Sequence, residues 1–398
     1  MLHNKNIVLG VTGGIAAYKA AALCSALVKA GASVDVIMTK NAANFVAPMT
    51  FSTLTQHSVS IDTFARVSSY DVSHISLAQK ADLFVVAPAS ANSIAKMAGG
   101  IADDMLSTTL LASRAPKLVA PAMNTGMLDN PATQDNLARL RGWGVELIFG
   151  DDGLLACGDV GRGRMAEPEQ ILDRMEQMLT PKDLLGKTVL ITAGPTREAL
   201  DPVRFLSNHS TGKMGYQLAR AARNRGARVV LVSGPVALTP PAGVAVVPVT
   251  TAAEMLEAVR RELSGADLII GAAAVADYTP KTQAPEKLKK SGEELTLELA
   301  QTRDILAWVG QNRRPGQVMV GFAMETQDLL HNARAKLERK GAQLVVANSL
   351  RQEGAGFGVD TNVVTLVTRE GEEPLPLMSK YEVAHRVLDK ALALAPQA

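Results

Sequence analysis

The chain has 398 residues, of which 47% are hydrophobic and 20% charged, and a net charge of +2. This length exceeds one ordinary hydrophobic core and predicts two domains, while the near-neutral charge argues against nucleic acid as a partner. No apolar run reaches the roughly 18 residues of a membrane span. The chain starts without a charged-then-apolar leader and has only two cysteines, Cys24 and Cys157, so we expect the reducing cytoplasm and no disulfide framework.

The first half begins with a strand–helix–strand pattern. Residues 6–12 predict an apolar strand, which Gly13-Gly14 ends in a tight turn. An Ala-rich helix over 15–29 and a second strand over 33–39 follow, as in a parallel α/β sheet of nucleotide-binding type. The turn lacks the G-x-G-x-x-G pattern and Asp35 lies inside the second strand, which disfavours a dinucleotide. A mononucleotide such as FMN fits better.

Polar turns follow two further strands, predicted at 82–87 and 117–120. Open α/β sheets bind ligands at the carboxyl ends of their parallel strands. We therefore expect one crevice built from Gly13, Gly14, Thr39, Ser90, Asn92 and Asn124, with Ser107 also within reach. A Gly- and Arg-rich segment over 151–165 and a helix over 167–179 close this domain, and residues 181–187 are the predicted linker.

The second half opens with a strand at 188–192, a polar loop, and a helix from about Lys213. A strand, a loop and a helix N-terminus place free backbone N–H groups at one spot, which suits a phosphate or a carboxylate. The loop is not a Walker A loop, because Met214 stands where Ser or Thr would ligate Mg²⁺.

The remaining elements alternate as in another α/β sheet. Residues 277–292 are rich in lysine and lack periodicity, which predicts a mobile lid or cover loop. Around it we expect strands at 228–233, 244–247, 268–273, 295–299, 318–322, 344–347 and 361–368, and helices at 252–263, 304–311, 327–340 and from Ser379.

Several stretches carry a family resemblance over nearly the whole chain. They are GVTGGIAAYK, APASANSIAKMAGGIADDMLST, PAMN and ACGDVGRGRM in the first half, and ITAGPTRE, DPVRFLSNHSTGKMG, AAAVADY and PEKLKK in the second. The chain resembles the bacterial bifunctional coenzyme A biosynthesis flavoproteins, phosphopantothenoylcysteine decarboxylase/phosphopantothenate–cysteine ligase. The resemblance implies two three-layer Rossmann-like α/β domains: a flavodoxin-like flavin-binding cysteine decarboxylase over 1–180 and a Rossmann-like ligase over 188–398.

The resemblance also implies two consecutive reactions. In the ligase half, 4′-phosphopantothenate attacks the α-phosphate of CTP with the help of Mg²⁺, and L-cysteine displaces CMP from the acyl-cytidylate. In the other half, FMN oxidises the thiol of the product so that CO₂ can leave, and then returns the hydride. The implied assembly is a homo-oligomer, a dodecamer built from decarboxylase trimers and ligase dimers.

The two cysteines and His74 have ordinary interpretations beside functional ones. Cys24 lies on the apolar face of an Ala-rich helix and is expected to be a core residue. Cys157 lies in a Gly-rich loop, where a core cysteine would be unusual, and the resemblance makes it the proton donor of the decarboxylation. His74 alone would be a capping or surface histidine. The resemblance makes it catalytic, together with Asn124.

In the ligase half, Lys287 alone would belong to a solvated charge run and Asp277 would cap a strand. The resemblance implies catalytic roles for Arg204, Asn208 and Lys287. It also implies a CTP site made of Gly271, Ala272, Ala273, Asp277, Lys287, Asp304, Ile305, Phe322, Lys336 and Lys340. Lys336 and Lys340 are four residues apart, so both can reach the same phosphates from one helix face. The family's N-P-D-I loop is Thr302-Arg303-Asp304-Ile305 here, and the Mg²⁺ ligands stay unassigned.

Two rival interpretations remain. A non-catalytic flavodoxin-like electron carrier fused to a nucleotide-binding regulatory domain would carry aromatic residues beside the flavin, yet aromatic residues are 4% of the chain. None lies in the Gly13 or Pro88 turns. A first domain related to flavin prenyltransferases or peptide-cysteine decarboxylases would share the fold but would not need the second half.

Overall fold

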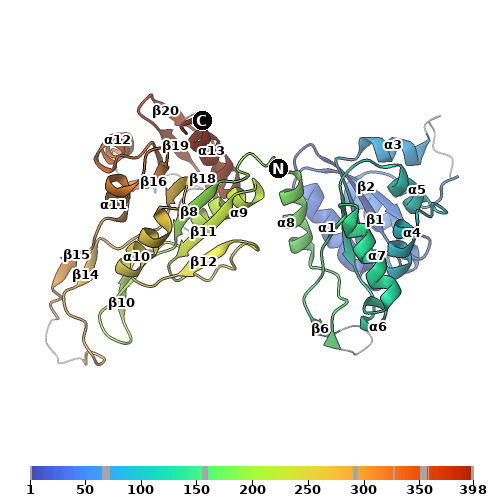
Figure 1. Ribbon diagram of the computed structural model, residues 1–398, viewed down its shortest axis with the longest axis horizontal. Coiled ribbons are helices and arrows are strands. Elements are labelled where there is room, and N and C mark those ends of the chain that lie inside the picture. The colour runs from blue at the N-terminus through green and yellow to red at the C-terminus, as the bar shows by residue number, and fades with distance from the viewer. Residues whose placement is uncertain are drawn as a thin grey trace. The chain divides into compact units, whose positions relative to one another are not determined.

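The computed structural model describes residues 2–64, 72–154, 160–289, 295–325, 328–349, 356 and 358–395 (Figure 1). The chain divides into two compact units, Met1–Thr180 and Pro181–Ala398. In each unit, helices cover both faces of a central, mainly parallel sheet, and a separate hydrophobic cluster fills each face. The predicted α/β class is confirmed.

The sheet of the first unit has five parallel strands in the order β2-β1-β3-β4-β5. They are β1 (Asn6–Val11), β2 (Ser33–Met38), β3 (Leu83–Ala89), β4 (Lys117–Pro121) and β5 (Glu146–Leu147). Strand β3 is buried along its whole length, because both faces of the sheet are covered. A short antiparallel pair, β6 (Gly153–Leu154) and β7 (Val160–Gly161), lies outside this sheet.

The helices of the first unit occupy two layers. On one face, α1 (Ala17–Lys29), α2 (Pro48–Thr55) and α8 (Pro168–Leu179) bury their apolar sides against β1 and β3. On the other face lie α4 (Ala91–Gly99), α5 (Met105–Ala112) and α7 (Pro131–Gly142). The shorter elements are η1 (Ala42–Asn44), α3 (Ser73–Lys80) and α6 (Thr125–Leu128).

The sheet of the second unit has eight strands in the order β12-β11-β8-β13-β16-β17-β19-β20. The first six are parallel, and β19 and β20 run antiparallel to them at one edge. The strands are β8 (Thr188–Ala193), β11 (Arg228–Ser233), β12 (Ala245–Pro248), β13 (Leu268–Gly271), β16 (Val318–Glu325), β17 (Leu344–Ser349), β19 (Val364–Val367) and β20 (Glu372–Pro374).

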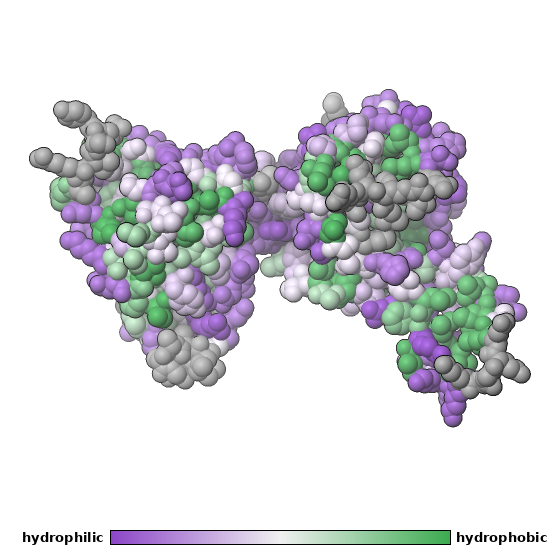
Figure 2. All heavy atoms as spheres, turned by 180° about the vertical axis from the view of Figure 1, so that it is seen from behind, coloured by the Kyte–Doolittle hydropathy of each residue, from purple (hydrophilic) through white to green (hydrophobic). Residues whose placement is uncertain are grey.

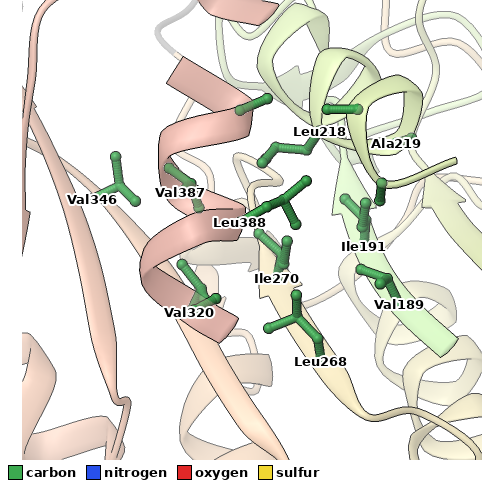
Figure 3. Packing of buried hydrophobic residues seen from close by; sticks show 14 of the residues in the cluster. Val189, Ile191, Leu218, Ala219, Leu268, Ile270, Val320, Val346, Val387 and Leu388 are labelled. Carbon is green, nitrogen blue, oxygen red and sulfur yellow. The ribbon is translucent and has the colours of Figure 1, made fainter. Parts of the chain in front are cut away.

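Two helices cover one face of this sheet and three cover the other. Helices α9 (Lys213–Asn224) and α13 (Lys380–Ala393) share one cluster, in which Leu218 and Leu388 pack over Ile191 and Ile270 (Figure 3). Helices α10 (Ala252–Leu263), α11 (Ile305–Asn312) and α12 (Leu329–Lys340) form the opposite layer. A separate antiparallel pair consists of β18 (Thr361–Asn362) and β21 (Met378–Ser379).

Two small hairpins correct the predicted elements. The polar loop after β8 contains β9 (Arg197–Ala199) paired with β10 (Phe205–Ser207), which the sequence did not predict. The strand expected at 295–299 is instead β15 (Leu299–Gln301), paired with β14 (Tyr278–Pro280). Strands of three residues are too short to show a period of two, so the pattern failed here. Both hairpins project from the sheet of the second unit (Figure 1).

Candidate active sites

A cavity of about 710 Å³ lies at the carboxyl edge of the second unit's sheet. Residues that follow β13, the start of α11, β16 and the helix α12 all contribute to its wall. The predicted CTP residues that line it are Gly271, Ala272, Ala273, Asp277, Asp304, Ile305, Phe322, Lys336 and Lys340. Lys287 is not among the lining residues.

Helix α12 brings two lysines to this wall. The Nζ of Lys336 donates a hydrogen bond to the carbonyl oxygen of Phe322 in β16. Lys340 is buried and forms an ion pair with the carboxylate of Asp304. Asp304 also caps α11, because its other carboxylate oxygen accepts a hydrogen bond from the N–H of Ala307 at 2.9 Å. Burial opposes ionisation of Asp304, but the hydrogen bonds from Lys340 and Ala307 keep its pKa below the usual value.

The loop before α9 reaches the same cavity. Ser210, Thr211 and Gly212 line it, and Gly212 is the N-cap of α9 with a φ of 79°, a conformation that favours glycine. Asn208 is not a lining residue. Its Nδ2 donates hydrogen bonds to the carbonyl oxygens of Ala274 (3.0 Å) and Val275 (3.1 Å), which do line the cavity.

Arg204 does not line this cavity. It takes part in a set of hydrogen bonds that hold the predicted cover loop, residues 277–292. Its Nε donates to the carboxylate of Asp201 at 2.9 Å, and its Nη2 donates to the carbonyl oxygen of Leu288 at 2.7 Å. The N–H of Leu288 donates to the same carboxylate at 3.1 Å. Asp201 is buried, and Arg204 holds its pKa far below the usual range. No sequence pattern singles out Asp201, because this contact joins residues far apart in the chain.

In the first unit, the polar turns after β1, β2 and β3 are joined by hydrogen bonds. The hydroxyl of Thr12 donates to the carbonyl oxygen of Pro88 and accepts from the N–H of Ser90, both at 2.8 Å. The hydroxyl of Thr39 accepts from the N–H of Ala42 at 3.2 Å. A Cβ on Gly13 would lie 2.6 Å from the Cβ of Asn41, so only glycine lets these turns approach so closely.

The other predicted residues of the first unit lie in several elements. Asn124 caps α6 through a 2.8 Å bond from the N–H of Gly126. Ser107 is buried in α5, in a capping box with Asp104, whose side chain accepts from its N–H at 2.8 Å. Asn92 is exposed in the first turn of α4, and His74 is half-buried in the first turn of α3. Cys157 lies outside the described residues.

The turns of the first unit fit a phosphorylated cofactor. A Cβ on Gly14 would meet nothing within 4 Å, so the backbone there is open to an approaching group. The first turns of α1 and α4 carry no acidic residue, and such helix N-termini favour anions. The turns that carry Gly14, Thr39 and Ser90 are therefore chemically compatible with an anionic group such as a phosphate.

The part of the chain that the structure describes has no helix long and apolar enough to cross a membrane. Among the same residues, no group of three or more His, Cys, Asp and Glu side chains is placed to hold a metal ion. Two mainly parallel sheets, one with joined polar turns and one with a cavity at the carboxyl ends of its strands, define a two-domain α/β protein of the class that commonly binds ligands at those ends.

Comparison with known proteins identifies both units. A family model described as Flavoprotein matches residues 1–180, and one described as DNA/pantothenate metabolism flavoprotein C-terminal domain matches residues 184–394. The coenzyme A biosynthesis bifunctional protein CoaBC of Bacillus subtilis (strain 168) is 52% identical over 402 residues, covering 100% of this chain and 99% of that protein. The protein of the same name from Escherichia coli (strain K12) is 45% identical over 394 residues, covering 98% of this chain and 97% of that protein.

A solved structure of the C-terminal domain of CoaBC is 44% identical and covers 52% of this chain and 95% of its own, with a TM-score of 0.45. The chain belongs to the family of coenzyme A biosynthesis bifunctional proteins. It is a bifunctional enzyme with decarboxylase and ligase activities, so the predicted family, fold class and pair of activities are confirmed. The electron-carrier interpretation is wrong.

Proposed function

We propose that residues 188–398 join 4′-phosphopantothenate to L-cysteine with CTP and Mg²⁺, and that residues 1–180 decarboxylate the product to 4′-phosphopantetheine with FMN. The observation that supports the ligase assignment best is the single cavity that contains every predicted CTP residue except Lys287. The cavity suits a nucleoside triphosphate, because Lys336 and Lys340 can neutralise charge on its phosphates.

In this proposal, different walls of the cavity contact different parts of the nucleotide. Gly271, Ala272 and Ala273 carry the smallest side chains of the wall, so a ligand can approach their backbone. A Cβ on Gly271 would lie 2.5 Å from the side chain of Leu306. Phe322 and Ile305 offer an apolar wall. The departure at Thr302-Arg303 leaves both residues on the cavity wall, so their contacts would come from different side chains than in the N-P-D-I loop.

For the first unit, bound FMN would supply the reversible oxidation of the substrate thiol that makes loss of CO₂ possible. Gly13, Gly14, Thr39, Ser90, Asn92 and Ser107 are the proposed flavin residues, and His74, Asn124 and Cys157 the proposed catalytic ones. The catalytic role proposed for Asn124 is supported by the return of the segment after Cys157 to the residue next to it. The N–H of Met123 donates to the carbonyl oxygen of Gly163 at 3.0 Å.

The proposed homo-oligomer, a dodecamer of decarboxylase trimers and ligase dimers, has support in the second unit. Hydrophobic residues gather on the projecting hairpins (Figure 2). They include Val203, Phe205, Tyr278, Leu295 and Leu299, each at least 40% exposed. An apolar surface of this kind commonly marks a protein interface. The chain has only two cysteines, which supports a cytoplasmic location, where structural disulfides are rare.

The proposed ligase function is tested by incubating the protein with 4′-phosphopantothenate, CTP and Mg²⁺, with and without L-cysteine, and following the products by mass spectrometry. We expect acyl-cytidylate and pyrophosphate without cysteine, and 4′-phosphopantetheine with it. Absence of any cytidylated product from the folded protein would contradict the proposal.

Two variants separate the steps. Lys287→Gln should suppress the acyl-cytidylate and pyrophosphate release, because the proposed triphosphate ligand is lost. Asn208→Asp should form the intermediate but pass it poorly to cysteine, because a negative charge then stands beside the reacting acyl group. Lys281→Gln is the matched control for Lys287, since Lys281 is an exposed lysine of the same segment that meets Glu298 at 3.4 Å. If Lys287→Gln accumulates intermediate as wild type does, Lys287 is only a solvated charge.

A further inference from the structure

Asp35 is a charged residue in the middle of β2, a largely buried strand. Its neighbours Val34 and Val36 belong to one hydrophobic cluster of the first unit, so the side chain of Asp35 faces the opposite side of the sheet. Val8, which pairs with Asp35 in the register of β1 and β2, and Ile37 belong to the cluster on that side. The Asp35 side chain is only 14% exposed. A carboxylate in such a place is costly unless its partners hold it.

Two basic side chains contact this carboxylate. The Nζ of Lys80 donates a hydrogen bond to its Oδ2 at 2.7 Å, and the Nδ1 of His57 lies 2.9 Å from its Oδ1. His57 follows the end of α2, and Lys80 is the last residue of α3. Asp35 therefore joins one strand of the sheet to the chain after α2 and to the end of α3. None of the three residues belongs to the proposed flavin or catalytic sets.

Helix α3 has few polar attachments to the rest of the first unit. It begins at Val72 without a side-chain cap. Among the described residues, its hydrogen bonds to other elements involve only Ala78 and Lys80. Ala78 is buried, and its carbonyl oxygen accepts a hydrogen bond from the hydroxyl of Ser113 at 3.2 Å. Both attachments lie in the C-terminal half of the helix, so the pair with Asp35 is one of two polar contacts that fix its place.

The first turn of α3 carries His74, the residue proposed to be catalytic. His74 is half-buried and stands six residues before Lys80, about 9 Å away along the helix axis. Leu77, between them, packs against the cluster that contains Leu106 of α5, and the proposed flavin residue Ser107 follows in the same helix. A short helix moves as one element. A contact that fixes its last residue therefore also fixes His74 relative to α5.

We propose that Asp35 is a positioning residue of the decarboxylase, which through Lys80 holds α3, and with it His74, in the place that the reaction requires. This inference rests on the proposed catalytic role of His74. His57 contacts the second oxygen of the carboxylate and so helps to keep the first oxygen directed at Lys80. If Asp35 served only the stability of the fold, its loss would remove flavin and activity together instead of slowing turnover in a protein that keeps its flavin.

The test measures turnover of phosphopantothenoylcysteine and flavin content in the full-length protein. Asp35→Asn and Lys80→Met each remove the charge of one partner. Both should lower kcat by about tenfold or more and leave the flavin content at its wild-type value, because small misplacements of a catalytic group cost large factors in rate. Lys80→Arg keeps the charge and should retain most of the activity. The matched control is Asp62→Asn, whose exposed carboxylate accepts only the N–H of Phe64, at 3.0 Å, among the described residues.

A double variant identifies the route of the effect. In a His74→Asn background, Asp35→Asn should cause no further loss of the residual kcat, because the group that it positions is already gone. A further tenfold loss in that background would overturn the proposal. Wild-type turnover of Lys80→Met, or loss of flavin in step with activity, would overturn it as well. The Lys80 variant decides the outcome if Asp35→Asn does not fold, because the Lys80 side chain is 39% exposed.

The role of His74 and the role of Asp35 are separated by a second measurement. Full turnover by His74→Asn would refute the proposed catalytic role of His74 itself. Hydrogen exchange of residues 73–80 would then still report on Asp35, because Asp35→Asn should accelerate it while Asp62→Asn should not. Unchanged exchange in Asp35→Asn would show that Asp35 does not hold α3.

Discussion

His385 is a partly buried histidine whose ring has little to stabilise its charged form. It lies beside Arg225, which donates to the His385 carbonyl oxygen at 3.2 Å, and its Nε2 is buried without a hydrogen-bond partner in the described part of the chain. Burial, and then the charge of Arg225, lowers the pKa of His385 from 6.5 to about 4. The unfolded chain therefore binds a proton at a higher pH than the folded protein does.

It follows that the second unit should lose stability as the pH falls from 6.5 toward 4, the window between the two pKa values. His385→Gln removes this titration, so its midpoint of urea unfolding should depend less on pH over the same window. The matched control is His331→Gln, at an exposed position of α12. Equal pH dependence in wild type and His385→Gln would show that this histidine does not contribute.

Cys24 is a core residue, as the sequence predicted. It is fully buried in α1, and burial raises the pKa of its thiol to about 11. A thiol reacts as its thiolate, so Cys24 should resist modification in the folded protein. We expect Cys157→Ser to show no reactive thiol toward a disulfide reagent until denaturant is added, and Cys24→Ala to keep the reactivity of wild type. Rapid labelling of native Cys157→Ser would contradict the burial.

Asp201 and Arg204 hold the cover loop through hydrogen bonds to the backbone of Leu288. Besides the contacts with Leu288, the N–H of Ala284 donates to the carbonyl oxygen of Leu200 at 2.9 Å. Arg204 therefore also holds the loop that carries Lys287, and its catalytic role stays a prediction. A buried carboxylate can bind the guanidinium and several N–H groups at once because it offers acceptors only.

Asp201→Asn should release this loop, because the amide loses the charge that holds both Arg204 and the N–H of Leu288. We expect hydrogen exchange at Leu288 to accelerate by about tenfold or more, because its N–H loses a charge-assisted hydrogen bond. Glu298→Gln is the control, because its ion pair with Lys281 is exposed. Unchanged exchange at Leu288 in Asp201→Asn would show that other contacts hold the loop.

At the scale of the whole molecule, the segment expected to link the domains packs onto the second unit. Asp183 forms an ion pair with Arg225, and the N–H of Leu184 donates to the Arg225 carbonyl oxygen at 3.0 Å. Leu184 is 1% exposed and belongs to the cluster under α9 and α13. The guanidinium of Arg225 also forms an ion pair with Asp389 of α13, at 2.7 Å. Through Arg225, residues 181–187 therefore help to hold the last helix in place.

Fragments 1–180 and 181–398 should each fold and keep one activity. A ligase fragment that begins at Thr188 should be less stable than one that begins at Pro181, by about 2 kcal/mol or more, because it loses the burial of Leu184. Urea unfolding of the two ligase fragments measures the difference. Fragment 1–180 should be oligomeric by light scattering. Equal stability of the two ligase fragments would contradict the structural role of residues 181–187.

The sequence alone determined the elements whose signals are local. The helix over 252–263 has the predicted bounds, because Thr251 and Glu254 form a capping box and the apolar residues repeat at helical spacing. The helix after Ser379 follows from the same kind of cap. Buried parallel strands such as β3 and β13 appear as short apolar runs between turns. The proposed CTP residues came from the family resemblance rather than from any local signal in the chain.

Only the tertiary structure decided which distant residues meet. Lys213 and Lys380 are far apart in the chain, and only the packing of α9 on α13 brings them to one cavity. The contact of Asp201 with Leu288 likewise depends on the path of the projecting hairpins. Sequence periodicity reports which face of an element is buried but not which element covers it, because long-range packing is chosen by the shape of the whole domain.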